Sequence, residues 1–116
     1  MSFSVHGESI TDGNASGGIA VTLYESGSTT VRTLGAKEVL HVTDVRIQLE
    51  SDYPASLVSD SKAAGRYLVH GRMSAKGGVI IHFSKPYVCP PGTGLKFYGA
   101  DNNLNTCLIE GFIREG

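Results

Sequence analysis

The sequence predicts an all-β protein, an antiparallel β-sandwich of seven or eight strands. Several short segments alternate apolar and polar residues with the period of two that is typical of half-buried strands. Fifteen glycines supply turns between these segments. No segment has the pattern of a long helix, and no internal repeat is present. Many short strands joined by turns indicate two packed antiparallel sheets.

Composition limits the classes of partner. The 116 residues, 41% hydrophobic and 18% charged, are typical of one globular domain. The formal net charge is −1, with basic and acidic residues spread evenly, so we expect neither nucleic acid nor a membrane surface as a partner. The chain contains no run of eighteen apolar residues and no secretion-signal pattern at its start, so we expect synthesis in the cytoplasm.

The sequence divides into a short N-terminal part and one domain. Residues 1–18 are expected to form an N-terminal arm or edge strand, over Ser2 to Glu8, followed by a Gly-rich loop from Thr11 to Gly18. Residues 19–116 are expected to form a single β-sandwich domain. The alternation predicts strands within residues 19–24, 30–34, 38–50, 66–73, 79–83, 95–98 and 106–114. Residues 51–65 look like a polar connection, with space for a helical turn over 59–64.

The longest of these segments changes phase. Leu40 and Val42 are apolar at one parity, whereas Val45, Ile47 and Leu49 are apolar at the other. One extra residue in a strand has this effect, so we expect a β-bulge near Val42 to Asp44.

The segment from Gly77 to Gly99 is expected to be the central hairpin. Its first strand is apolar on both faces around Val79 to Phe83, which is typical of an interior strand. Prolines 86, 90 and 91 cannot donate ladder hydrogen bonds, so residues 84–93 must leave the sheet or follow an edge. A second strand, Leu95 to Tyr98, would then complete the hairpin.

The sequence contains no set of residues that indicates catalysis or metal binding. Alternation gives the four histidines, His6, His41, His70 and His82, no common direction, so we expect no metal site and no cofactor. The sequence contains neither a nucleophile motif nor a phosphate-binding glycine loop. The carboxylates fall on solvated faces or loops, so we expect that the protein is not an enzyme. Cys89 and Cys107 lack metal-site spacing and are expected to be two buried free thiols.

The strand order from Val39 to Glu115 and one motif resemble a family. The motif is a strand, an aromatic residue, a proline, an apolar residue and a Pro-Pro-Gly turn, formed by Phe83, Pro86, Val88, Pro90, Pro91 and Gly92. It resembles small jelly-roll proteins of bacteriophage virions. The resemblance implies a jelly-roll sandwich that acts as a capsid decoration or cement protein. It also implies a homotrimer bound to the major capsid protein on the virion surface after synthesis in the host cytoplasm.

The alternative is a receptor-binding or carbohydrate-binding module of a phage tail. Five tyrosines could stack on sugar rings, although tyrosine is also an ordinary strand residue: Tyr24, Tyr53, Tyr67, Tyr87 and Tyr98. A cement protein should instead expose apolar contacts near its base. The residues expected to make those contacts are Phe3, Val5, Tyr53 and Leu57.

Overall fold

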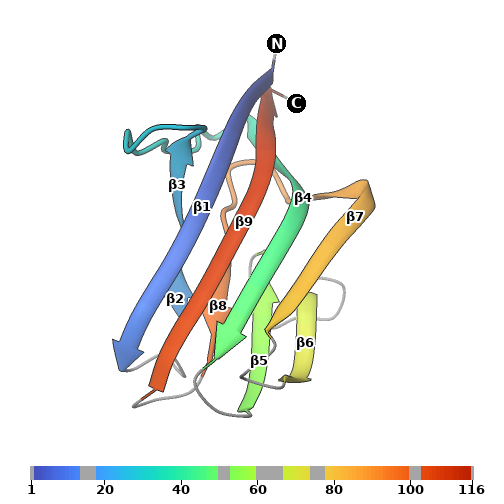
Figure 1. The fold of residues 1–116 in the computed structure, drawn as a ribbon. Coiled ribbons are helices and arrows are strands. Elements are labelled where there is room, and N and C mark those ends of the chain that lie inside the picture. The colour runs from blue at the N-terminus through green and yellow to red at the C-terminus, as the bar shows by residue number, and fades with distance from the viewer. Residues whose placement is uncertain are drawn as a thin grey trace.

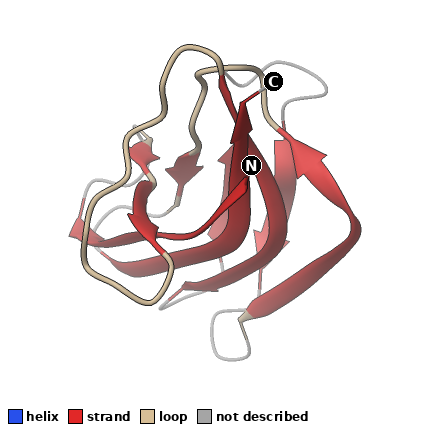
Figure 2. Ribbon diagram, turned by 90° about the horizontal axis from the view of Figure 1, so that it is seen from above, coloured by secondary structure: helices blue, strands red, loops and turns tan. Residues whose placement is uncertain are grey.

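The computed structural model describes residues 2–13, 18–49, 53–59, 67–73, 78–99 and 103–115. Two antiparallel sheets face each other, and no helix occurs in these ranges (Figures 1 and 2). The expected all-β antiparallel sandwich is therefore confirmed, although the described residues form nine strands rather than seven or eight.

The larger sheet has five strands in the order β3-β1-β9-β4-β7. Their bounds are Thr22–Glu25 for β3, Ser2–Gly13 for β1, Asn103–Glu115 for β9, Glu38–Leu49 for β4 and Val79–Val88 for β7. The smaller sheet has the order β2-β8-β5-β6. Its strands are β2 (Ile19–Ala20), β8 (Lys96–Tyr98), β5 (Tyr53–Val58) and β6 (Tyr67–Met73).

One core lies between the inner faces of the two sheets. Its largest fully buried side chains come from β4, β5, β8 and β9: Phe97, Leu40, Ile47, Leu57, Ile109 and Ile113. Burial of each such side chain contributes about 1.5 to 3 kcal/mol to stability.

The last strand, β9, follows its sequence pattern closely. Cys107, Ile109 and Ile113 are buried, whereas Glu110 and Arg114 on the opposite parity are exposed. Strand β9 pairs with β1 on one side and β4 on the other, so only its outer face remains uncovered.

The bulge in β4 is also confirmed. Val42 lies opposite Gly111 of β9, and the next paired residue, Asp44, lies opposite Glu110, which leaves Thr43 as the extra residue. Because the bulge reverses the parity, Val42 and Val45 both reach the core.

The expected N-terminal arm or edge strand is wrong. Strand β1 pairs with β9 from Ser2 to Gly13 and with β3 from Val5 to Glu8, so it lies inside the five-stranded sheet. The expected loop therefore begins later than Thr11. The apolar signal of β1 is weak because its buried positions after Val5 are Gly7 and Ser9. A Cβ at Gly7 would lie 2.7 Å from the side chain of Ile109 and 2.8 Å from that of Val21, so these core side chains would have to shift for any larger residue there.

The single strand expected over residues 19–24 is divided between the sheets. Ile19 and Ala20 pair with β8, whereas Thr22 to Glu25 pair with β1. Of the strand expected over residues 30–34, only an isolated bridge between Val31 and Tyr24 is present.

The polar connection expected over residues 51–65 contains a strand instead. β5 pairs with β6 and β8, and its Leu57 lies opposite Phe97 in the core. Pro54 and the surrounding serines have low strand propensity, so the sequence pattern does not predict this strand. The strand forms because its pairing on both sides outweighs that low propensity. Residues 60–64, most of the expected helical turn, lie outside the described ranges.

The interior position expected for the strand Val79 to Phe83 is wrong, because β7 is an edge strand and Ile80 is 75% exposed. The expectation that residues 84–93 leave the sheet or follow an edge is confirmed, because residues 84–88 belong to the edge strand β7 and residues 89–93 lie outside any strand. The β4–β7 ladder jumps from Asp44–His82 to Val42–Tyr87, so residues 83–86 of β7, with Pro86, bulge out. β7 and β8 belong to different sheets and form no hairpin.

Candidate functional site

The outer face of the five-stranded sheet carries apolar side chains that the core does not cover. A solvated sheet face is ordinarily polar. Here Ile80 of β7, Ile10 of β1 and Leu104 of β9 point outward, and the latter two are 59% and 46% exposed. We call the surface formed by the outward residues of β1, β9, β4 and β7 the outer face.

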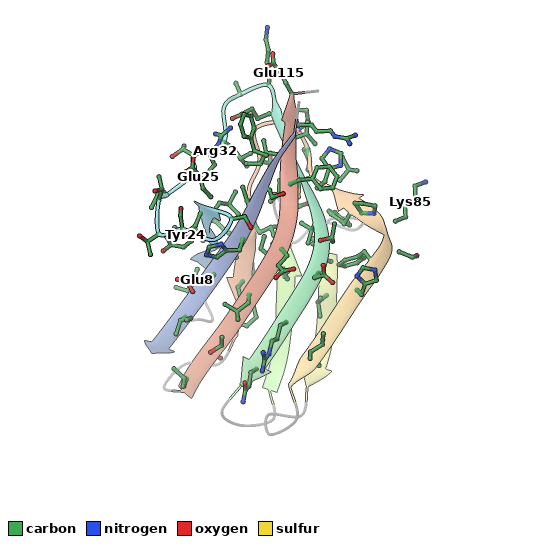
Figure 3. All side chains as sticks on the ribbon, turned by 45° about the horizontal axis from the view of Figure 1, so that its top comes forward. Glu8, Tyr24, Glu25, Arg32, Lys85 and Glu115 are labelled. Atoms are coloured by element: carbon green, nitrogen blue, oxygen red, sulfur yellow. The ribbon has the colours of Figure 1, made fainter. Side chains whose placement is uncertain are left out.

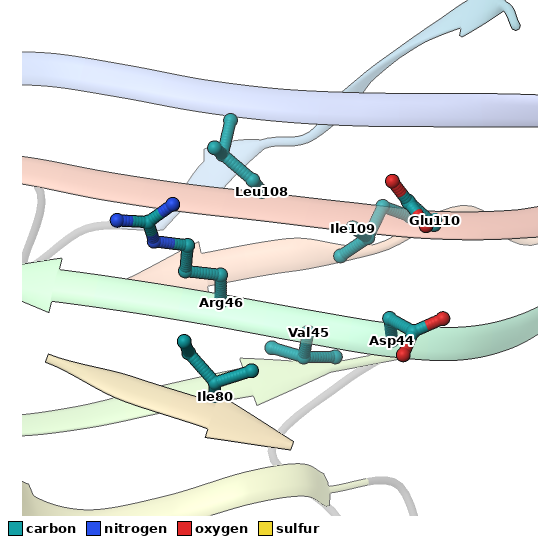
Figure 4. Close-up of a pocket in the computed structure, with 7 residues that line it drawn as sticks. All are labelled: Asp44, Val45, Arg46, Ile80, Leu108, Ile109 and Glu110. Atoms are coloured by element: carbon teal, nitrogen blue, oxygen red, sulfur yellow. The ribbon is translucent and has the colours of Figure 1, made fainter. Parts of the chain in front are cut away.

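Strand register places these side chains in rows. Leu108 of β9 lies opposite Glu8 of β1 and Arg46 of β4, and Arg46 lies opposite Ile80 of β7. Figure 4 shows Leu108, Arg46 and Ile80 side by side across three strands. We call these three residues the arginine row. They line a pocket of about 310 Å³ together with Asp44 and Glu110.

The neighbouring row is acidic. Asp44 of β4 lies opposite Glu110 of β9, and both point outward beside the arginine row (Figure 4). The Nδ1 atom of His82 lies 2.8 Å from Oδ1 of Asp44, and the hydroxyl of Thr43 donates to Oδ2 at 2.9 Å. These two hydrogen bonds, that of His82 first, lower the pKa of the Asp44 carboxyl. We call Asp44, Glu110 and His82 the acidic row.

Aromatic rings occupy the next row. The ring of Phe112 in β9 stacks on His41 of β4 with a centroid distance of 4.7 Å, and the Arg114 guanidinium lies 5.0 Å from the same ring. Burial lowers the pKa of His41, and the positive charge of Arg114 adds to this effect. Both effects favour the neutral form of the imidazole.

The residues expected to contact a partner do not gather on one surface. Phe3 is 49% exposed, with the Arg32 guanidinium 5.4 Å from its ring centroid. Val5 and Leu57 are buried, so the expectation that they are exposed is wrong. Val5 of β1 and Leu57 of β5 point into the core from the two opposite sheets. Tyr53 lies in β5, and its side chain is outside the described part of the structure.

The sequence did contain a signal for the outer face. Leu108 and Phe112 form a second apolar parity in β9, and Ile80 does the same in β7. Such strands are apolar on both sides, which in an antiparallel sandwich indicates a covered second face. Only the register between β9, β4 and β7 places Leu108 and Ile80 in one row and Phe112 in another.

The described tyrosines lie in separate places. Tyr24 stacks on His6 at the β3 edge of the sheet, whereas Lys85 marks the opposite edge (Figure 3). Tyr87 packs against the core and its hydroxyl lies 3.2 Å from that of Ser59. Tyr98 packs against Gly18, where a Cβ would lie 2.6 Å from its ring. These three rings therefore form no shared platform for a sugar.

Cys89 and Cys107 are free and buried, as the sequence predicts. Burial raises the pKa of each thiol to about 12. Within the described ranges, no three or more His, Cys, Asp and Glu residues are arranged to hold a metal ion.

The fold and the outer face define a two-sheet antiparallel β-sandwich protein with an exposed, partly apolar sheet surface. Comparisons with protein-family models, curated proteins and solved structures found no match for the chain. A search of the described residues for a helix long and apolar enough to span a membrane found none.

Proposed function

We propose that the chain is a non-enzymatic structural protein of a bacteriophage virion, a jelly-roll decoration or cement protein that binds the major capsid protein. Strand order supports the jelly-roll part of this proposal. With β3 set aside, the eight remaining strands numbered along the chain have the order 1-8-3-6 in one sheet and 2-7-4-5 in the other. Two Greek keys wound into two sheets have this order, and the architecture is frequent among viral capsid proteins and lectins.

The observation that carries the functional part is the outer face. It combines exposed apolar side chains with a row of carboxylates and an arginine, which is the mixture of an interface centre and its polar surroundings. A surface of this kind suits attachment to another protein. If several copies attach to adjacent capsid subunits, modest contacts add up to firm binding.

The carbohydrate-binding alternative has less support. The Phe112 ring on the outer face already contacts His41 and Arg114. The described tyrosines are dispersed, so stacking on a sugar would have to use single rings.

Co-sedimentation with heads that lack the protein tests the proposal. The heads come from the phage that encodes the chain, and we expect the purified protein to sediment with them. Leu104→Asp, on the outer face, should abolish this binding, whereas Lys96→Glu, on the exposed side of the other sheet, should preserve it. Failure of the unmodified protein to bind heads, together with binding on a glycan array, would overturn the proposal in favour of the alternative.

A further inference from the structure

We propose that the outer faces of two copies of this chain pack against each other across a two-fold axis. The axis runs across the strands at the level of Val45 in β4 and Ile109 in β9, which are register partners. This goes beyond attachment to a capsid, because the partner is a second copy of the same surface. Both surfaces of the contact therefore carry the same charged and apolar side chains, in positions that the structure gives. The two contacts use the same outer face, so a copy paired in this way must separate from its partner before it attaches to a capsid.

The acidic row and the arginine row lie on either side of this axis. Asp44 and Arg46 point to the same face of β4, two residues apart, which corresponds to about 6.6 Å along a strand. Glu110 and Leu108 are related in the same way on β9. A two-fold rotation about the axis exchanges the rows, so the arginine row of one copy faces the acidic row of the other.

Within the described part of one copy, each row contains a charged side chain that has no partner of opposite charge. Asp44 and Glu110 are like charges directly opposite each other on neighbouring strands, an arrangement that is destabilising by itself. The hydrogen bond from His82 reaches only Asp44. Among the described residues, neither the Glu110 carboxylate nor the Arg46 guanidinium has a hydrogen-bonded or ion-paired side-chain partner.

The rotation supplies these missing partners. Packed sheets lie about 10 Å apart, a gap that an extended arginine and a carboxylate side chain fill together. The planar guanidinium of Arg46 has five donors and can bind Asp44 and Glu110 of the other copy at once. Because the contact is isologous, the same set forms twice.

The apolar groups match under the same rotation. Ile10 lies opposite Thr106, and Ser4 lies opposite Phe112, in rows at equal distances from the axis on its two sides. The exposed Ile10 of one copy is therefore placed near the Phe112 ring of the other. The exposed Ile80 comes to lie over His82 of the other copy, so both isoleucines leave water.

The test is the mass of the protein in solution, measured by light scattering across a range of concentrations. We expect twice the 12.3 kDa mass of the chain, or an even multiple if a further contact also forms. Arg46→Glu should raise the dissociation constant of the dimer by roughly 100-fold or more, because two close charge pairs become repulsive. Asp44→Arg should do the same. Lys96→Glu makes the same charge change on the other sheet and should have no effect.

Mixing the two variants makes the test specific for this geometry. In a heterodimer of R46E with D44R, each introduced charge faces an opposite charge, so a mixed dimer should form although neither variant dimerises alone. A monomer or a trimer of the unmodified chain at all concentrations would overturn the inference, as would variants that fail to complement each other. Thermal melting of each variant identifies any loss of fold, and Ile80→Ser, which changes no charge, then provides the second test. Binding to heads is measured separately, so the two proposals can fail independently.

Discussion

Leu57 and Phe3 were equivalent as candidate contacts in the sequence, but the structure gives them different surroundings. Leu57 is fully buried opposite Phe97, whereas Phe3 is half-exposed at the start of β1. Leu57→Ala removes packed methyl groups and leaves a cavity, so we expect a loss of about 3 kcal/mol in the free energy of unfolding. For Phe3→Ala we expect a loss below about 1 kcal/mol. Urea denaturation of both variants measures the difference, and equal losses would contradict the placement of Leu57.

A second residue-scale feature is the ion pair between the loop after β3 and the start of β4. The Arg32 guanidinium donates to both carboxylate oxygens of Glu38, once at 3.0 Å, and the Gly35 N–H donates to the same carboxylate at 2.8 Å. The hydrogen bond from Arg32, followed by that from Gly35, lowers the pKa of Glu38. Arg32 also contacts the Phe3 ring, so the pair fastens this loop to β1 and β4.

This ion pair predicts a pH dependence. Because folding lowers the pKa of Glu38, its contribution to stability is present above the unfolded pKa of about 4.3 and is lost as pH falls through the lower folded value. Glu38→Gln should therefore lower the Tm at pH 7, and its difference from the unmodified protein should shrink below about pH 4.3. Thermal melts between pH 7 and pH 2 measure this difference. Glu8→Gln, in β1 and without an ion-paired partner among the described residues, is the control and should leave the Tm at pH 7 nearly unchanged.

At the scale of elements, strands β9 and β4 lie very close together at the bulge of β4. Gly111 of β9 lies there opposite Val42, and a Cβ at Gly111 would overlap the backbone oxygen of His41. Backbone cannot move aside without breaking the β4–β9 ladder. We therefore expect Gly111→Ala to cost about 3 kcal/mol or more, or to prevent folding.

Gly94 provides the matched control. A Cβ added there meets no atom within 4 Å, so Gly94→Ala should change stability by no more than about 0.5 kcal/mol. Denaturation curves of the two alanine variants compare them directly. Equal stabilities would show that β4 and β9 are not held this closely at the bulge.

Elements were predictable where the pattern was local. The faces of β9 and the bulge of β4 follow from apolar parity alone. β1 was missed because its buried positions include Gly7 and Ser9, and β5 was missed because its pairing with β6 and β8 depends on strands distant in the sequence. The assignment of β7 and β8 to different sheets is likewise a property of their partners. The rows of the outer face also depend on strand partners: the apolar residues could be identified in the sequence, but their arrangement in rows follows from the register between strands.

At the scale of the whole molecule, two thiols lie in the common interior. Cys89 follows β7 and Cys107 lies in β9, and burial raises the pKa of both to about 12. The thiolate form that reacts with an alkylating reagent is therefore strongly disfavoured in the folded state at pH 8. If the sandwich opens as one unit, iodoacetamide should modify both cysteines slowly and at a common rate.

Mass spectrometry of the modified peptides over time measures the two rates. In denaturant, where both thiols have ordinary pKa values, modification should be complete within minutes, which is the control. Rapid modification of Cys89 alone in native buffer would show that the segment after β7 opens independently of the sandwich.

The pairing of the first strand with the last also determines where attached polypeptides leave the molecule. Ser2 lies opposite Arg114, and both ends of the chain emerge at the same end of the sandwich (Figure 1). Gly13 and Asn103 pair at the far end of the same two strands. A tag or a reporter domain fused to either terminus would thus project from one pole and leave the opposite pole unobstructed. Two fluorophores placed on both termini would sit close enough for efficient energy transfer in the folded state, and that transfer would be lost on unfolding.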